Sequence, residues 1–424
     1  MIPISFDEIA ELGLGWLDGG DRDRSITGIK ADSRDVGPGD LFVALNFGVE
    51  HVDDARSRGA ATLVPDDQEA ALAALASLVR SKSSARVVAV VGSAGKTSTK
   101  DILAALCAPH AATLWPEKSL NNEIGLPLTV CRLEPETEIL ITEMGMRGLG
   151  QVAALSAIAR PNIAVVSHIG PEHLELLGTV ERVAEANAEV IAALPPGGTA
   201  VVPARSVELE PFLSRVDIDF RRFDPADAKL ENGHGRFRID GQTVELELPF
   251  TQRHHACNTL AALHAYAELG LPLDRVFAGA PQIRLSPWRG QEIALPGGGF
   301  VVNDAYNANP DSMRAALVHL AERAGTRRRV AVLGGMAELG DSSERYHREI
   351  GELARDLKIE VIAVGEPARE YGSMAWAPDA EAAVEAARAL LESGDAVLVK
   401  ASRAVGLEGI PAEITKIAGE WSQS

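Results

Sequence analysis

Short apolar segments alternate with helical segments through most of this 424-residue chain. Residues 86–91, 139–142 and 163–166 are mostly apolar, and a helical pattern follows each of them. A strand that is apolar on both faces must be covered on both sides. This is typical of a parallel sheet that lies between two layers of helices. The alternation therefore predicts an α/β fold for the middle of the chain.

The length of the chain predicts several domains, because one hydrophobic core does not extend over so many residues. The first domain, residues 1–83, is a small α/β unit with a short apolar strand at 41–45. The second, residues 84–288, is a parallel sheet of the phosphate-loop ATPase type with a small antiparallel insertion at 218–250. The third, residues 289–424, contains four further apolar strands and is expected to be Rossmann-like.

Charge and cysteine content limit the partners and the compartment. The formal net charge is −19, so we expect no nucleic-acid partner, and a phosphorylated ligand must be held by local groups. The three cysteines form no Cys-x-x-Cys pair, which favours a reducing compartment. The acidic N-terminus lacks a secretory signal, and no stretch approaches the roughly 18 apolar residues of a membrane helix. We therefore expect a cytoplasmic protein without membrane insertion.

The sharpest local signal is a glycine-containing loop between the strand at 86–91 and the helix that follows. It reads Gly92-Ser93-Ala94-Gly95-Lys96-Thr97-Ser98. Glycines in this setting let backbone amides surround phosphates, while a lysine reaches the terminal phosphates and a hydroxyl binds Mg²⁺. We expect Lys96 at the β- and γ-phosphates of ATP and Thr97 on Mg²⁺. Because the loop is shorter than the standard pattern, an ordinary turn with a surface lysine is the alternative.

Two further polar side chains follow neighbouring apolar strands. Glu143 directly follows the strand at 139–142, and His173 lies in the loop after the strand at 163–166. Ligands of open α/β sheets bind at the carboxyl ends of strands, so both side chains are candidates for one site. A carboxylate suits Mg²⁺, whereas histidine is a less usual ligand. A plain strand-end carboxylate and a hydrogen-bonded loop histidine are the alternatives.

Several motifs occur in the order found in one family of ligases. Besides the phosphate loop, they are Asn121-Asn122-Glu123-Ile124-Gly125-Leu126-Pro127, Glu143-Met144-Gly145, His173-Leu174-Glu175, Asp304-Ala305-Tyr306-Asn307-Ala308-Asn309-Pro310-Asp311-Ser312-Met313, Gly334-Gly335-Met336-Ala337-Glu338-Leu339-Gly340 and Lys400-Ala401-Ser402-Arg403. Together these motifs resemble the Mur ligase family over nearly the whole chain. The block at 304–313 is most similar to the branch of the family that adds D-alanyl-D-alanine.

The resemblance implies an ATP-dependent amide ligase that uses ATP and Mg²⁺. Its substrates would be UDP-N-acetylmuramoyl-tripeptide and D-alanyl-D-alanine. The terminal carboxylate of the tripeptide would be activated as an acyl phosphate before the amine attacks. The N-terminal domain would hold the UDP part of the substrate, and the protein is expected to act as a monomer.

The resemblance also implies a role for individual residues. Catalytic roles fall to Lys96, Glu143 and His173. Nucleotide-binding roles fall to the phosphate loop from Gly92 to Ser98 and to His254, Asn258, Asp304, Tyr306, Asn307 and Asn309. Substrate-binding roles fall to Ser33, Arg34, Asn121, Asn122, Lys400, Ser402 and Arg403.

One position departs from the family pattern in a way that concerns the metals. The family usually has a carbamylated lysine in the helix after His173, where it helps to hold a second metal ion. Asn187 stands in its place. Asparagine is shorter and uncharged, but its carbonyl oxygen could reach a metal directly or through water. The expected metal ligands are therefore Thr97, Glu143, His173 and Asn187, with Asn187 within water-bridging distance of the second ion.

Two alternatives stay open. Another member of the family, such as the ligase that adds the third amino acid or a folate-polyglutamylating relative, would share the ATP site. The block at 304–313 argues against both of these. A degenerate relative that binds a nucleotide or UDP-sugar without ligation stays open because of Asn187 and because residues 46–54 lack the usual Asp-Gly-His element. The intact residues Lys96, Thr97, Glu143 and His173 argue against it.

Overall fold

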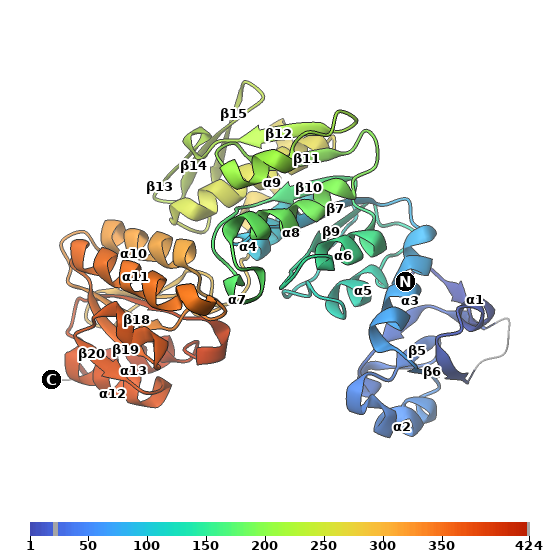
Figure 1. Ribbon diagram of the computed structural model, residues 1–424, viewed down its shortest axis with the longest axis horizontal. Helices are drawn as coiled ribbons and strands as arrows, with labels where there is room; N and C mark the ends of the chain where they lie inside the picture. The colour runs from blue at the N-terminus through green and yellow to red at the C-terminus, as the bar shows by residue number, and fades with distance from the viewer. Residues whose placement is uncertain (20–23, 422–424) are drawn as a thin grey trace.

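The structure is a computed structural model that describes residues 1–19 and 24–421. Its sheets and covering helices confirm the α/β fold expected from the sequence (Figure 1). The central domain lies between the N-terminal domain, blue in Figure 1, and the C-terminal domain, orange to red. Within the described residues, the helices are too short or too polar to cross a lipid bilayer.

The N-terminal domain is a four-stranded sheet with the strand order β2-β6-β5-β4. The strands are β2 (Gly15–Asp18), β4 (Gly28–Lys30), β5 (Asp40–Val43) and β6 (Ala61–Pro65), and the helices are α1 (Phe6–Glu11), α2 (Val52–Ser57) and α3 (Gln68–Ser81). A separate antiparallel pair joins β1 (Ile4–Ser5) to β3 (Ser25–Ile26). β4, β5 and β6 are parallel, and β2 pairs antiparallel with β6 at the edge. The short strand expected at 41–45 is thus β5, inside the sheet.

The central domain is built on six parallel strands with the order β12-β11-β10-β7-β9-β8. The strands are β7 (Arg86–Val91), β8 (Thr113–Leu114), β9 (Ile139–Glu143), β10 (Ile163–Val166), β11 (Thr199–Pro203) and β12 (Asp219–Phe223). The helices are α4 (Lys96–Cys107), α5 (Gly125–Val130), α6 (Gln151–Ala159), α7 (Leu174–Leu177), α8 (Val180–Ala192) and α9 (Arg253–Glu268). Because β9 and β10 flank β7, the loops after these three strands leave the sheet side by side.

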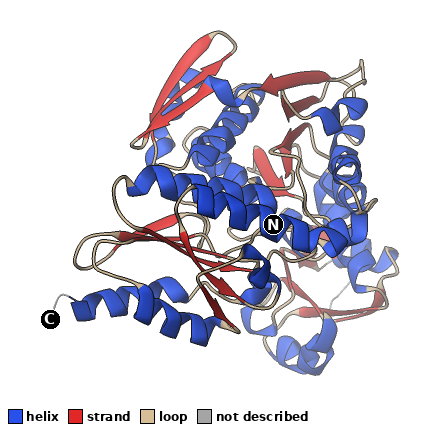
Figure 2. Cartoon of the chain, turned by 60° about the vertical axis from the view of Figure 1, so that its left-hand side comes forward, coloured by secondary structure: helices blue, strands red, loops and turns tan. Residues whose placement is uncertain are grey.

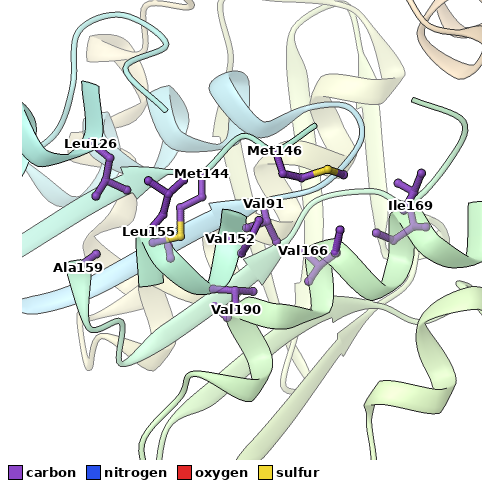
Figure 3. Packing of buried hydrophobic residues seen from close by; sticks show 14 of the residues in the cluster. Val91, Leu126, Met144, Met146, Val152, Leu155, Ala159, Val166, Ile169 and Val190 are labelled. Carbon is purple, nitrogen blue, oxygen red and sulfur yellow. The ribbon is translucent and has the colours of Figure 1, made fainter. Parts of the chain in front are cut away.

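Alternate residues of β7 point to opposite faces of the sheet, as the pleat of a strand requires. Val87, Ala89 and Val91 belong to a core that also contains residues of α5, α6 and α8. Val88 and Val90 belong to a second core with residues of α4 and α9. Figure 3 shows part of the first core, with side chains from the helices gathered against the strands. Burial on both faces explains why the strand is apolar almost throughout.

The antiparallel insertion is shorter than the sequence suggested. The expected range of 218–250 begins with residues that form β12, the parallel edge strand of the main sheet. An edge strand is partly exposed, so polar and apolar residues mix in it as they do in a hairpin. The insertion itself consists of β13 (Ala228–Glu231), β14 (His234–Ile239) and β15 (Gln242–Glu247). These strands stand apart from the parallel sheets in Figures 1 and 2.

The C-terminal domain is a six-stranded sheet with the order β16-β17-β21-β18-β19-β20. The strands are β16 (Gln291–Ala294), β17 (Phe300–Asn303), β18 (Arg329–Gly334), β19 (Glu360–Val364), β20 (Ala375–Ala377) and β21 (Ala396–Lys400), and the helices are α10 (Pro310–Ala324), α11 (Ser343–Asp356), α12 (Ala380–Leu390) and α13 (Ile410–Trp421). Helices cover both faces of this sheet in Figure 2. The four strands expected from the sequence are β17, β18, β19 and β21. The two edge strands, β16 and β20, were not expected, because they are short and partly exposed.

Close packing of α11 in the C-terminal domain gives a test of this fold. A methyl group on Gly351 would lie 2.1 Å from the carbonyl oxygen of Tyr371, in the turn Pro367–Tyr371. We expect Gly351→Ala to lower the free energy of unfolding in urea by about 1–3 kcal/mol, because the helix must move away. Gly419→Ala in α13 is the matched control, since a methyl group there meets no described atom within 4 Å. Equal stability of the two variants would contradict this packing.

Candidate active site

A cavity of about 610 Å³ lies at the carboxyl ends of β7, β9 and β10, between the central and C-terminal domains. It brings together most of the residues that the sequence placed at the site. These are Ser93, Ala94, Gly95, Lys96, Thr97, Ser98, Asn121, Asn122, Glu143, His173, His254, Asn258, Asp304, Tyr306, Asn307, Asn309 and Lys400. The convergence follows from the strand order, since the polar residues after adjacent parallel strands meet at one edge of the sheet.

The phosphate loop needs its two glycines. Gly92 has φ +128° and Gly95 has φ +83°, a region that other residues rarely adopt. A methyl group on Gly92 would lie 2.4 Å from the hydroxyl of Ser167, and one on Gly95 would lie 2.4 Å from Oδ1 of Asn258. Gly95 precedes the first residue of α4 and has no side chain that could cap the helix. The first amides of α4 can therefore bind an anion such as a phosphate group.

Lys96 and Thr97 begin α4 and face the cavity. The Lys96 ammonium donates to the carbonyl oxygen of Gly92 and lies 3.5 Å from the carboxylate of Glu172. The Thr97 hydroxyl accepts a hydrogen bond of 2.7 Å from the guanidinium of Arg289. The lysine is thus held at the loop by exchangeable contacts, from which it can turn towards a phosphate.

Glu143 is the last residue of β9, and its carboxylate is buried with only one of the two oxygens hydrogen-bonded. The residue is 1% exposed, and its Oε1 accepts hydrogen bonds of 2.6 Å from Ser119 and 2.7 Å from Asn121. Its Oε2 has no hydrogen-bond partner among the described residues. A buried carboxylate oxygen without a partner is costly unless a ligand satisfies it. Together with the Thr97 hydroxyl, this oxygen fits the ligand preference of Mg²⁺.

His173 lies where the chain turns into α7, with φ +49°. Its Nδ1 contacts the carboxylate of Glu338 in the C-terminal domain, and its Nε2 lies 3.8 Å from Glu172. The side chain therefore spans the junction of the two domains while its Nε2 stays on the cavity side.

Asn187 does not face the cavity as the sequence suggested. It is 1% exposed and lies on α8, behind the phosphate loop. Its Oδ1 accepts a hydrogen bond of 2.7 Å from the Gly92 amide, and its Nδ2 donates to the carbonyl of Val183 at 2.9 Å. Both polar groups are used by the backbone, so this side chain braces the loop instead of presenting an oxygen to a metal.

The C-terminal domain contributes a second group of polar residues. Oδ2 of Asp304 accepts a hydrogen bond of 2.6 Å from Lys400, which also donates to the carbonyl of Asn307 at 2.9 Å. Asn309 donates to the carbonyl of Ser93 at 3.1 Å and so ties this domain to the phosphate loop. Lys400 is consequently a buried partner of Asp304, with its ammonium at the cavity wall.

Four of the expected substrate residues lie away from this cavity. Ser402 is buried and bonds to the backbone of Ala337 and Ala308, and Arg403 pairs with Glu408. Arg403 also lies 4.4 Å over the ring of Trp288, so the expected contact of these two residues with substrate stays a prediction. Ser33 and Arg34 belong to the N-terminal domain, where Arg34 pairs with Asp32 and its side chain is 81% exposed.

Sequence reasoning missed Arg289, Ser119 and Glu172, all of which line the cavity. Arg289 bonds to Thr97 and stacks 3.9 Å from the ring centroid of Tyr306. Its position at the expected boundary between two domains was the available signal. Ser119 and Glu172 lie in loops, and no local pattern distinguishes them from other polar loop residues.

The brace from Asn187 predicts a specific loss of nucleotide binding. Asn187→Leu leaves the Gly92 amide unpaired and should weaken ADP binding about five- to tenfold, measured by calorimetry. The matched control is Asn162→Leu, because Oδ1 of Asn162 accepts from Val87 at the other end of β7, at 2.9 Å. Both variants should lose stability, but the control should keep ADP affinity. Equal weakening in both would show that the effect is general.

His254 predicts a pH dependence of stability. Burial lowers its pKa from the ordinary 6.5 to about 4, although the nearby Asp304 carboxylate favours the charged form. As the pH falls below 6.5, the unfolded chain binds the proton first, so the folded state loses stability until about pH 4. His254→Asn should reduce this loss by roughly 3 kcal/mol at most, measured as unfolding free energy over that range. The same pH dependence in parent and variant would contradict a desolvated, neutral His254 in the folded chain.

Comparisons with known proteins agree with the site described above. The description "Mur ligase middle domain" fits residues 90–266, and "Mur ligase, glutamate ligase domain" fits residues 288–403. The UDP-N-acetylmuramoyl-tripeptide–D-alanyl-D-alanine ligase of Escherichia coli (strain K12) is 32% identical, over 97% of this chain and 98% of that protein. The crystal structure I of MurF from Acinetobacter baumannii has a TM-score of 0.86 at 26% identity, covering 98% of this chain and 99% of the other.

A second solved structure relates the cavity to a nucleotide. MurF ligase from Thermotoga maritima in complex with ADP has a TM-score of 0.82 at 28% identity, covering 93% of this chain and 98% of the other. The two matched domains are also the two that build the cavity described above. The chain belongs to the Mur ligase family.

Proposed function

We propose that this chain uses ATP to join D-alanyl-D-alanine to the terminal carboxylate of UDP-N-acetylmuramoyl-tripeptide, a step in making peptidoglycan precursors. The name of a relative aligned over 97% of the chain supports this substrate pair. One structural observation carries the proposal. The phosphate loop, the half-used carboxylate of Glu143 and the polar residues of the C-terminal domain share one cavity.

On the nucleotide side, the chain supplies positive charge and oriented donors. Lys96 would leave the Gly92 carbonyl for the β- and γ-phosphates, while the first amides of α4 hold the phosphate chain. Arg289, which lies over Tyr306 beside the loop, would turn from the Thr97 hydroxyl to phosphate oxygens. Thr97 and Glu143 would hold Mg²⁺, which neutralises phosphate charge when it is bound.

The reaction itself requires activation of a carboxylate, because forming an amide from a carboxylate and an amine is unfavourable in water. An oxygen of the tripeptide carboxylate attacks the γ-phosphorus, the bond to the bridging oxygen breaks, and ADP leaves. The amine of D-alanyl-D-alanine then attacks the acyl carbon, and phosphate leaves with the activated oxygen. The protein contributes position, charge and exclusion of water, which would hydrolyse the acyl phosphate.

The three domains divide the substrates between them. The C-terminal domain closes over the nucleotide through Asn309 and the Asp304–Lys400 pair. The N-terminal domain would hold UDP, where the exposed guanidinium of Arg34 can meet a diphosphate. Asn121 and Asn122, on the other side of Glu143, would lie near the muramoyl peptide. We propose that a monomer acts in the cytoplasm, where ATP is supplied.

The test is phosphate release from ATP by the purified chain. We expect release only when UDP-N-acetylmuramoyl-tripeptide and D-alanyl-D-alanine are both present. Lys96→Ala should lower turnover by about 100-fold or more, because the main cation at the phosphates is lost, with an unchanged thermal midpoint. The substrate control is the UDP-linked dipeptide with lysine or diaminopimelate. Turnover with that pair instead would assign the chain to another branch of the family.

A further inference from the structure

Glu172 places a carboxylate inside the cavity that none of the roles above uses. Its side chain is 11% exposed, and Oε2 lies 3.5 Å from Nζ of Lys96 and 3.8 Å from Nε2 of His173. It lines the same cavity as Glu143. Two carboxylates that face a polyanionic nucleotide repel it, unless cations lie between them and the phosphates.

The position of Asn187 makes this second carboxylate important. Its side chain bonds to the backbone of Gly92 and Val183 and does not line the cavity, so it is turned away from the ion expected beside His173. An imidazole ligand such as His173 brings no negative charge to a metal ion. Glu172 is the neighbour of His173 in the chain, and its carboxylate reaches the same part of the cavity.

We infer that Glu172 supplies the negatively charged ligand of the second divalent cation that the resemblance implies beside His173, on the side of the cavity where the carboxylate to be activated meets the γ-phosphate. This inference rests on the proposed function. Neighbouring ligands of an octahedral Mg²⁺ are about 3 Å apart, so their 3.8 Å separation must close by roughly 1 Å. Phosphate oxygens and water complete the site.

The contact between Glu172 and Lys96 links the cation to the phosphate loop. A divalent ion attracts the Glu172 carboxylate more strongly than one ammonium group does, because its charge is twice as large. Entry of the ion therefore frees Lys96 to turn to the phosphates. Binding of the ion by Glu172 and release of Lys96 therefore both favour binding of the nucleotide.

Counting bound Mn²⁺ ions tests the inference. Mn²⁺ accepts both oxygen and imidazole ligands, and electron paramagnetic resonance reports how much of it is bound. The full chain, saturated with β,γ-imido-ATP, should hold two ions, and Glu172→Gln, saturated in the same way, should hold one. Glu175→Gln is the matched control. It removes the same charge three positions further on, on the exposed side of α7, and should keep both ions.

Each other outcome has a distinct meaning. If Glu172→Gln binds two ions as tightly as the parent chain does, Glu172 serves only as a counter-ion of Lys96, and the inference is overturned. If Asn187→Leu loses an ion and Glu172→Gln does not, the second ion is served by Asn187 and not by Glu172. A single ion in the parent chain would also overturn the inference while the first metal site stands. No nucleotide-dependent ion at all would instead remove the proposed function.

Discussion

The peptide of Gly92 is the point on which the geometry of the site depends. Its N–H is held by Asn187 from α8, and its carbonyl oxygen is held by Lys96 from α4. Its left-handed backbone leaves no room for a side chain against Ser167. The loop begins at the end of the central strand β7, whose sheet is covered by helices on both faces. These contacts therefore hold the amides that meet the phosphates in a fixed position relative to the sheet.

The cavity needs two domains, which share one apolar cluster and are also joined by polar side chains. Asn309 bonds to the phosphate loop, Asp311 bonds to His168 at 2.9 Å, and Arg289 bonds to Thr97. Such contacts can be exchanged for ligand groups at small cost, unlike the apolar packing inside each domain. This is the arrangement expected of an enzyme that must open to admit substrates and close to exclude water.

Charge is balanced locally although the chain as a whole is strongly acidic. Lys96 and Arg289 line the cavity together with Glu143 and Glu172, and Lys96 lies 3.5 Å from Glu172. The carboxylates would oppose a nucleotide if it came alone, and they favour a nucleotide that arrives with divalent ions. The affinity for the nucleotide and its dependence on divalent ions are therefore set by the same four side chains. The net charge of −19 does not decide them.

The sequence by itself determined the α/β fold, the position of the phosphate loop, Glu143 and the order of the family motifs. These depend on local patterns, namely apolar runs, glycines and residues at strand ends. Only the tertiary structure decided that Asn187 turns to the Gly92 amide, that Arg289 and Glu172 enter the cavity, and that Ser402 and Arg403 stay outside it. The direction of a side chain depends on the packing of elements far apart in the chain. The place of β12 at the edge of the main sheet likewise depends on its pairing with β11, which no local pattern shows.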